Sequence, residues 1–303
     1  MDKQHIEELL DPGAIARAEA LGMHARYVVE GYMAGEHKSP YRGFAIEFAQ
    51  HREYAPGDDT RHLDWKVLGR TDRYFIKQYE QETNYVAHIL LDGSESMQYG
   101  SGKLTKLQYG KMMAACLSYL ILHQRDAVAL GIFDDRMRDF APRSDSKGTI
   151  HRIMSRLAAY QGAQRTDIPR TLHDLALQLR RKGIVIIISD FFDEEEAMLE
   201  GIRHLRFGGH EVIVLHTLDA DELEFPFQGL VEFHGLENLP KLLTRPREIR
   251  QTYQKVFGEF CTRLRRGCER NHVHYVQINT RQPLSQVLSS YLTFRLRTAK
   301  SKY

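Results

Sequence analysis

Features that mark secreted, membrane-spanning or nucleic-acid-binding proteins are scarce in this 303-residue sequence. Three cysteines, Cys116, Cys261 and Cys268, are too few and too scattered for a disulfide scaffold, so we expect reduced packing residues. No stretch is apolar for long enough to span a bilayer, and the first ten residues lack the apolar core of a secretory signal. The 42 basic and 40 acidic side chains nearly cancel, which favours neither nucleic acid nor an anionic membrane. We therefore expect a cytoplasmic protein without a transmembrane segment.

Common catalytic and zinc-binding motifs are also missing. The 15 histidines form no H-E-x-x-H and the cysteines no C-x-x-C, so we expect no zinc site, although His272 and His274 would share one face of a strand. Residues 100–103 (Gly-Ser-Gly-Lys) are similar to the end of a phosphate-binding loop. However, Met97 and Leu104 stand where that loop has glycine and a hydroxyl residue. The sequence therefore predicts no ATP binding through this loop.

From residue 83 onward, apolar runs alternate with amphipathic stretches. Strand-like runs lie at 86–92, 127–133, 137–142, 183–190, 211–219 and 273–279, with a short hairpin expected over 222–235. Helical periodicity lies at 103–124, 149–160, 169–181, 194–207, 246–271 and 283–297. This order predicts an α/β fold of three layers, with a mostly parallel, doubly wound sheet and one antiparallel hairpin at Asp134-Asp135.

The first 82 residues have a different character and predict a small N-terminal α/β region ahead of the domain at 83–303. Residues 1–34 have helical spacing of apolar side chains. Residues 40–82 are rich in glycine, charges and aromatics, and predict short β segments joined by turns, one of them at 56–59 (Pro-Gly-Asp-Asp).

Polar side chains follow two of the predicted strands and precede one helix. Asp92-Gly93-Ser94-Glu95-Ser96 comes directly after the strand at 86–92, Asp190 ends the run at 183–190, and Thr166-Asp167 precedes the helix at 169–181. Ligands of open α/β sheets bind beyond the carboxyl ends of the strands, so we expect the three loops to converge there. The alternative is a polar loop in which Asp92 caps the following helix.

One or two carboxylates with several hydroxyls suit a hard cation such as Mg²⁺, which takes six oxygen ligands and usually keeps some waters. Neutral hydroxyls leave much of the ion's charge uncompensated, so it remains attractive to an incoming carboxylate. The sequence therefore predicts a divalent-cation site, most simply for Mg²⁺.

This constellation resembles the metal-ion-dependent adhesion site of von Willebrand A domains. Upstream, the sequence between 42 and 97 resembles the signature of the bacterial Domain of Unknown Function 58 family. The matching residues are Arg42-Gly43-Phe44, Glu47-Phe48, Arg52-Glu53-Tyr54, Pro56-Gly57-Asp58-Asp59, Arg61, Leu63-Asp64-Trp65, Arg70, Lys77, Glu80 and Glu82, which lead into LLDGSESM.

The resemblance implies a three-layer von Willebrand A-like fold and five metal ligands. These are Asp92, Ser94, Ser96, Thr166 and Asp190. It also implies a MoxR-type AAA+ ATPase, or its client, as partner. One departure is Gln164-Arg165 before Thr166, where related sequences often have glycines. Many relatives also carry membrane helices ahead of this region, and here none is expected.

We therefore expect a binding module, not an enzyme: a partner's Asp or Glu would take the open coordination position, and no catalytic base is evident. The alternative is a Mg²⁺-dependent phosphoester hydrolase, with Asp92 as nucleophile or ligand and Asp190 as second ligand. Ser94 stands where a haloacid-dehalogenase-like site has aspartate, and this difference disfavours the hydrolase. Basic clusters at 263–270 and 295–302 predict solvated helix faces, with docking of an acidic partner as the other reading.

Overall fold

The computed structural model describes residues 9–13, 15–16, 46–55, 63–81, 86–123, 126–146, 148–162, 167–179, 182–234 and 241–300. The chain divides into two compact units. The smaller unit spans residues 34–84, and the larger one takes in residues 1–33 and 85–303.

The larger unit is built on a six-stranded sheet with the strand order β10-β7-β6-β3-β4-β5. Its strands are β3 (Val86–Asp92), β4 (Ala127–Phe133), β5 (Met137–Ser144), β6 (Ile184–Ser189), β7 (Glu211–Leu218) and β10 (His274–Asn279). Neighbouring strands pair in parallel except β5, which runs antiparallel to β4. The direction of winding reverses between β3 and β6, which is where a doubly wound sheet opens a ligand crevice. The predicted mostly parallel sheet with one antiparallel hairpin is confirmed.

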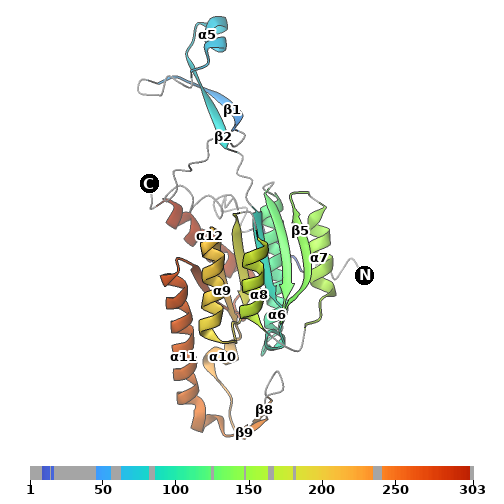
Figure 1. The fold of residues 1–303 in the computed structure, drawn as a ribbon. Helices are drawn as coiled ribbons and strands as arrows, with labels where there is room; N and C mark the ends of the chain where they lie inside the picture. The colour runs from blue at the N-terminus through green and yellow to red at the C-terminus, as the bar shows by residue number, and fades with distance from the viewer. Residues whose placement is uncertain are drawn as a thin grey trace. The chain divides into compact units, whose positions relative to one another are not determined.

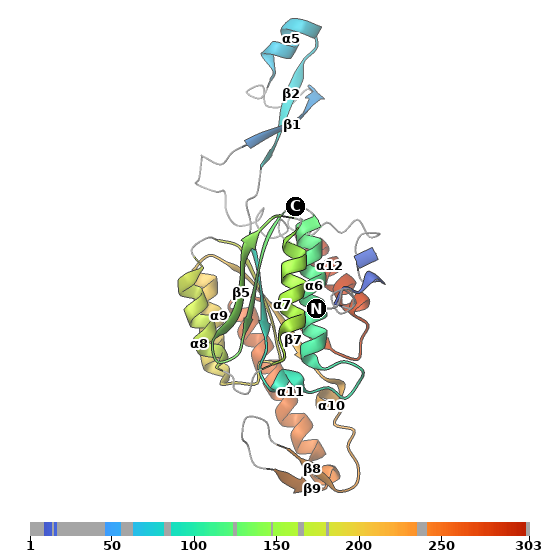
Figure 2. The same ribbon diagram turned by 90° about the vertical axis from the view of Figure 1, so that its right-hand side faces the viewer.

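Helices cover both faces of this sheet and complete the predicted three layers (Figures 1 and 2). One face is covered by α6 (Lys106–His123), α7 (Thr149–Ala159) and α12 (Leu284–Lys300), and the other by α8 (Ile168–Gln178), α9 (Glu195–Phe207) and α11 (Pro246–Arg270). Within the described residues, no helix combines the length and the apolarity needed to cross a membrane.

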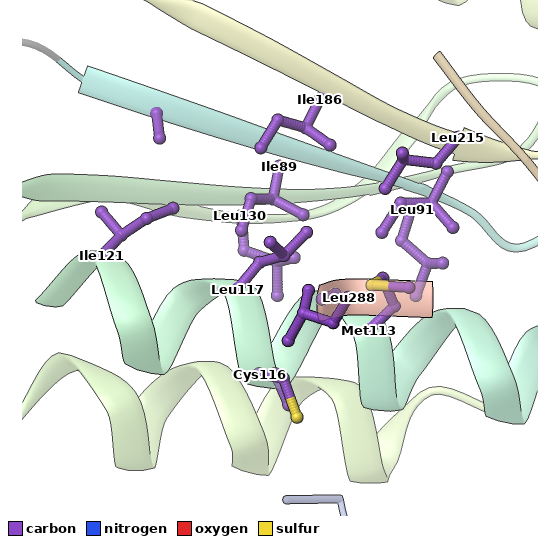
Figure 3. Close-up of a cluster of buried hydrophobic side chains, with 14 of the residues drawn as sticks. Ile89, Leu91, Met113, Cys116, Leu117, Ile121, Leu130, Ile186, Leu215 and Leu288 are labelled. Atoms are coloured by element: carbon purple, nitrogen blue, oxygen red, sulfur yellow. The ribbon is translucent and has the colours of Figure 1, made fainter. Parts of the chain in front are cut away.

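Two hydrophobic cores lie on either side of the sheet because successive side chains of a strand point to opposite faces. Figure 3 shows the first core, in which Ile89 and Leu91 of β3 meet Met113 and Leu117 of α6. Leu90, between them in sequence, belongs to the second core with residues of α8, α9 and α11. A strand buried on both faces explains why the sequence of β3 is apolar throughout.

The three cysteines are free and buried, in agreement with their prediction as packing residues. Two of them, Cys116 and Cys268, are fully buried in the first and second core respectively. Burial raises the pKa of all three thiols to about 11 or 12.

The hairpin predicted over 222–235 is wrong. Residues 220–224 form the short helix α10 (Ala220–Glu224), because Asp219 and Glu222 make a capping box at its start. The strand β8 (Val231–Phe233) pairs instead with β9 (Leu242–Thr244), which lies beyond the predicted segment. The capping pair, separated by three positions, was a readable signal for a helix start.

In the smaller unit, β1 (Ile46–Glu53) and β2 (Phe75–Gln81) form an antiparallel ribbon. The helix α5 (Trp65–Thr71) lies between them in sequence, where only β segments were predicted. It begins at Asp64, whose carboxylate accepts hydrogen bonds from the backbone N–H groups of Lys66 (2.9 Å) and Val67 (3.3 Å). The predicted turn at 56–59 and most of the predicted helix at 1–34 lie outside the described residues.

Candidate metal-binding site

Asp92 is the last residue of β3 and is completely buried at the carboxyl edge of the sheet. Its Oδ1 accepts a hydrogen bond from the backbone N–H of Ser94 at 2.9 Å, which folds the chain back immediately after the strand. Its Oδ2 accepts a hydrogen bond from the Ser189 hydroxyl, at the end of the neighbouring strand β6, at 2.5 Å. Neither donor lies in a helix, so Asp92 aims at the strand ends rather than capping the next helix.

The next two predicted ligands lie together beside Asp92. Ser94 and Ser96 are both buried, and their Oγ atoms are 3.0 Å apart. Two oxygens bound at roughly 2.1 Å to adjacent corners of an octahedral Mg²⁺ site are separated by about 3 Å. The spacing of the two hydroxyls therefore fits a Mg²⁺ ion, as does the hydroxyl-rich donor set. Ser96 begins a short 3-10 helix, η2 (Ser96–Gln98), which holds this turn of the loop.

Asp190 follows β6 and is also completely buried, but its carboxylate has a protein partner. Its Oδ2 accepts a hydrogen bond from the Lys106 ammonium at 2.7 Å. The same ammonium lies 2.5 Å from Oε1 of Glu222 in α10. Lys106 is itself completely buried at the start of α6. Asp190 thus lies at the predicted edge, but as a member of an ion-paired triad.

The electrostatics of the edge are dominated by buried negative charge. Burial, and secondly the negative charge of Asp190, raise the pKa of Asp92 to about 7, although hydrogen bonds from Ser189 and Ser94 oppose this. Burial lowers the pKa of Lys106, but the carboxylates of Asp190 and Glu222 outweigh it and hold the pKa above its ordinary value. A cation placed beside Asp92 would favour the ionised carboxylate.

Thr166, the fifth predicted ligand, lies outside the described residues, together with Gln164 and Arg165. The residues that follow it are tied to the same edge. The Asp167 backbone N–H donates to the carbonyl oxygen of Asp134 after β4 (3.3 Å), and that of Ile168 donates to Asp193 Oδ2 after β6 (2.9 Å).

Several residues of this edge were missed by the sequence reasoning. Asp134 is completely buried after β4, and both of its carboxylate oxygens lie 2.6 Å from Arg138 Nε. The Tyr160 hydroxyl donates a hydrogen bond to the Gly93 carbonyl oxygen at 3.1 Å. A Cβ on Gly93 would lie 2.3 Å from the Tyr160 ring, so the absence of a side chain allows this contact. Asp134 had been predicted only as a turn residue.

Within the part of the chain that the structure describes, no group of three or more His, Cys, Asp and Glu side chains is arranged to hold a metal ion. Any cation at this edge would therefore depend on hydroxyl oxygens as well as carboxylates. Asp92, Ser94 and Ser96 meet that requirement, and Asp190 would contribute only by sharing its carboxylate with Lys106.

Comparison with known proteins gives one family and several uncharacterized relatives. A family model described as "Protein of unknown function DUF58" matches residues 50–259. Uncharacterized proteins of Mycobacterium tuberculosis and Mycobacterium bovis are 25% identical over 233 residues, which covers 75% of this chain and 72% of theirs.

Solved structures with a similar chain path include three proteins of low sequence identity. The conserved hypothetical protein BatB from Bacteroides thetaiotaomicron is 16% identical, over 71% of this chain and 99% of that one, with a TM-score of 0.48. An aerotolerance-related membrane protein from Bacteroides fragilis is 16% identical over 70% and 98% of the two chains, with a TM-score of 0.46. The SpRpn10 VWA domain is 14% identical over 69% and 95%, with a TM-score of 0.39. At these levels the likeness concerns the fold alone.

Proposed function

The chain belongs to the DUF58 family of proteins of unknown function, and from that premise we propose that it is a metal-dependent protein-binding module. Its binding face would be the carboxyl edge of the six-stranded sheet. The observation that carries the proposal is the pair of buried hydroxyls of Ser94 and Ser96, 3.0 Å apart, beside the buried carboxylate of Asp92.

In this proposal, Asp92, Ser94 and Ser96 hold a Mg²⁺ ion, with Asp190 and Thr166 as the remaining expected ligands. The bound ion would supply a positive charge that an Asp or Glu of a partner protein can neutralise. The chain's own part is to hold the ligands in place. The Ser189 hydroxyl fixes the carboxylate of Asp92, and the turn after β3 brings both serine hydroxyls to the same side.

The partner class that we propose is a MoxR-type AAA+ ATPase or its client, with this chain as an adaptor or assembly factor. This part rests on the family resemblance. What the site adds is a chemical requirement, because a hydroxyl-rich cation site selects a partner that presents an exposed carboxylate.

The direct test is Mg²⁺ binding by the full chain, measured by titration calorimetry. We expect Asp92→Ala and the double variant Ser94→Ala/Ser96→Ala to abolish binding. A matched control is Ser118→Ala, which removes a buried hydroxyl in the same helix as Lys106, whose hydrogen bond goes to the Ala114 carbonyl oxygen of that helix at 2.7 Å. Unchanged Mg²⁺ affinity in the site variants would contradict the proposal.

The partner is tested separately by co-purification with the MoxR-type ATPase of the same organism. Wild type and Asp92→Ala are each assayed in Mg²⁺ and in chelator. We expect the ATPase to be retained only by wild type in Mg²⁺. Equal retention under all four conditions would exclude metal-dependent binding.

The competing function is Mg²⁺-dependent hydrolysis of phosphoesters. A haloacid-dehalogenase-like site would need a second carboxylate where Ser94 stands, and the hydroxyl of Ser94 is instead within hydrogen-bonding distance of Ser96. We therefore expect no turnover of p-nitrophenyl phosphate in Mg²⁺. Turnover that disappears in Asp190→Ala would establish the enzyme instead.

A further inference from the structure

Lys106 combines complete burial with two short carboxylate contacts, and the proposed function does not use it. Its ammonium lies 2.7 Å from Asp190 Oδ2 and 2.5 Å from Glu222 Oε1. The ring of Phe192 lies over the same ammonium, with its centroid 4.8 Å away. Removing an ammonium from water is costly unless ionised partners surround it. Lys106 is therefore held in place by two carboxylates from different elements, the loop after β6 and the helix α10.

We infer that Lys106 is a built-in counter-ion that withholds Asp190 from a bound divalent cation and thereby sets the charge of the metal site. The inference rests on the proposed function, because it assumes that the cation binds beside Asp92, and it removes Asp190 from the expected ligands of the wild-type chain. It makes Lys106 a positioning residue, which acts on the metal through Asp190 and never contacts the metal itself.

The geometry of Asp190 supports this role. Its Oδ2 accepts from the Lys106 ammonium, while its Oδ1 lies 3.3 Å from the backbone N–H of Phe192. Both oxygens therefore already have donors from the protein. By contrast, the Ser94 and Ser96 hydroxyls are within hydrogen-bonding distance of each other, an arrangement that exchanges readily for bonds to a cation.

The balance of charge around Lys106 points the same way. Asp92, Asp190 and Glu222 are three buried or largely buried carboxylates, and Lys106 is the ammonium in contact with two of them. When all of them are ionised, the three carboxylates and the ammonium carry a net charge of two negative units, but Asp190 and Glu222 both contact the ammonium, so Asp92 is the carboxylate of the three that is not paired with it.

The consequence for partner binding is a cation that remains short of negative ligands. If Asp190 stays with Lys106, Asp92 is the ionised carboxylate left to the metal, and Ser94 and Ser96 are neutral. A metal with one carboxylate binds an incoming acidic side chain more strongly than one already neutralised by two. Lys106 would thus lower the affinity for the metal and raise the demand for a carboxylate from the partner.

The test is the charge-removing variant Lys106→Met in the full chain, titrated with Mg²⁺ by calorimetry and with Mn²⁺ by loss of the free-ion paramagnetic signal. We expect both ions to bind at least about tenfold more tightly than to wild type, because Asp190 is released and a nearby positive charge is removed. Without metal, the melting temperature should fall, and saturating Mg²⁺ should raise it by more than in wild type. In Lys106→Met/Asp190→Asn the gain in affinity should disappear.

Unchanged or weaker binding by Lys106→Met, with Mg²⁺ binding intact in wild type, would overturn the inference and leave the proposed function standing. Binding by Lys106→Met but not by wild type would support the inference while refuting the proposed function of the wild-type chain. Absence of binding in both would refute both ideas. A gain in affinity that persists in the double variant would also overturn the role of Asp190.

A second variant keeps the test decisive if Lys106→Met does not fold. Glu222→Gln leaves the ammonium with Asp190 alone and can still accept the N-cap hydrogen bond from the Asp219 backbone N–H, which is 2.8 Å in the wild type. In this variant Asp190 stays paired with Lys106 and one negative charge near the metal site is removed, so we expect Mg²⁺ to bind more weakly than to wild type. Tighter binding by Glu222→Gln would contradict the inference.

Discussion

A methyl group added at Gly93 tests whether the loop after β3 is held by Tyr160. Gly93 does not have a left-handed φ, so alanine meets no backbone strain there. Its Cβ would instead lie 2.3 Å from Cε1 and from the hydroxyl oxygen of Tyr160. Ordinary contacts between such atoms are roughly 3.5 Å, so the ring must move by about 1 Å or more. That movement breaks the hydrogen bond from the Tyr160 hydroxyl to the Gly93 carbonyl oxygen.

The magnitude follows from these two losses. A broken neutral hydrogen bond costs about 1 kcal/mol, and forced repacking typically costs about 1 to 3 kcal/mol. Tyr160 is only half-buried, so its ring has room to turn outward, which keeps the expected total for Gly93→Ala at about 1 to 3 kcal/mol of unfolding free energy. Tyr160→Phe, which removes only the hydroxyl, should cost about 1 kcal/mol.

The assay is urea denaturation of a double-mutant cycle, followed by circular dichroism. In the Tyr160→Ala background the ring is gone, so Gly93→Ala should cost less than about 0.5 kcal/mol there. The same cycle can be followed by Mg²⁺ titration, and Gly93→Ala should weaken binding only where the Tyr160 ring is present. If Gly93→Ala costs as much without the ring as with it, the steric argument is wrong.

Three further outcomes are expected. Burial, followed by the charge of neighbouring groups, lowers the pKa of His88 to about 4, and burial also lowers the pKa of His210. Both should therefore be neutral when folded at pH 7, so the contribution of His88 to the unfolding free energy should be constant above about pH 6.5 and fall by roughly 3 kcal/mol as the pH drops to 4. The raised pKa of Asp92 acts in the opposite direction, because it favours the folded state as the pH falls below about 7. His88→Leu should remove the contribution of His88 from the pH dependence measured by urea denaturation, so the difference in unfolding free energy between wild type and variant should change by roughly 3 kcal/mol between pH 6.5 and pH 4. A difference that does not vary with pH would contradict this. Ser189→Ala removes the donor to Asp92 and should lower the unfolding free energy, measured by thermal denaturation, by about 1 to 3 kcal/mol. As a control, the fluorescence of the smaller unit, measured without Mg²⁺, should change little. Asp64→Ala removes the N-cap of α5 and should speed amide exchange in that helix by about fivefold, equivalent to ~1 kcal/mol, whereas equal exchange rates would show that the cap is dispensable.

The sheet was predictable because its signals are local. The strands β3, β6 and β7 are buried on both faces, and such strands read as uninterrupted apolar runs. Parallel strands joined by helices then fix the side of the sheet at which Asp92 and Asp190 emerge. The family resemblance is confirmed by the match over residues 50–259, whereas the metal and the ATPase partner stay predictions.

Lys106 was not predictable in the same way. Lysine on a helix is normally solvated, and complete burial occurs almost only with paired charges. Its partners, Asp190 and Glu222, lie 84 and 116 positions away in sequence, so no local pattern reveals them. The one readable hint is that Lys106 shares a helical face with buried residues of α6 such as Tyr109 and Met113.

The contact between Tyr160 and the loop after β3 was hidden for a related reason. The sequence shows only that a glycine follows Asp92, and the group that approaches Gly93 closely is a side chain 67 positions away. The helix α5 was missed because seven residues with no buried side chain produce no amphipathic signal. Asp64, its cap, stands in the part of the sequence that carries the family resemblance.

The strand that ends in Asp92 is hydrogen-bonded to a neighbour along both of its sides. Amide hydrogens in such a position exchange with deuterated solvent only when the whole sheet opens, an event as rare as global unfolding. The base of the proposed binding edge should therefore keep its shape through very many cycles of local fluctuation. In the proposed function, differences in partner specificity would therefore come from substitutions in the loops around this edge, which do not destabilise the strands beneath it.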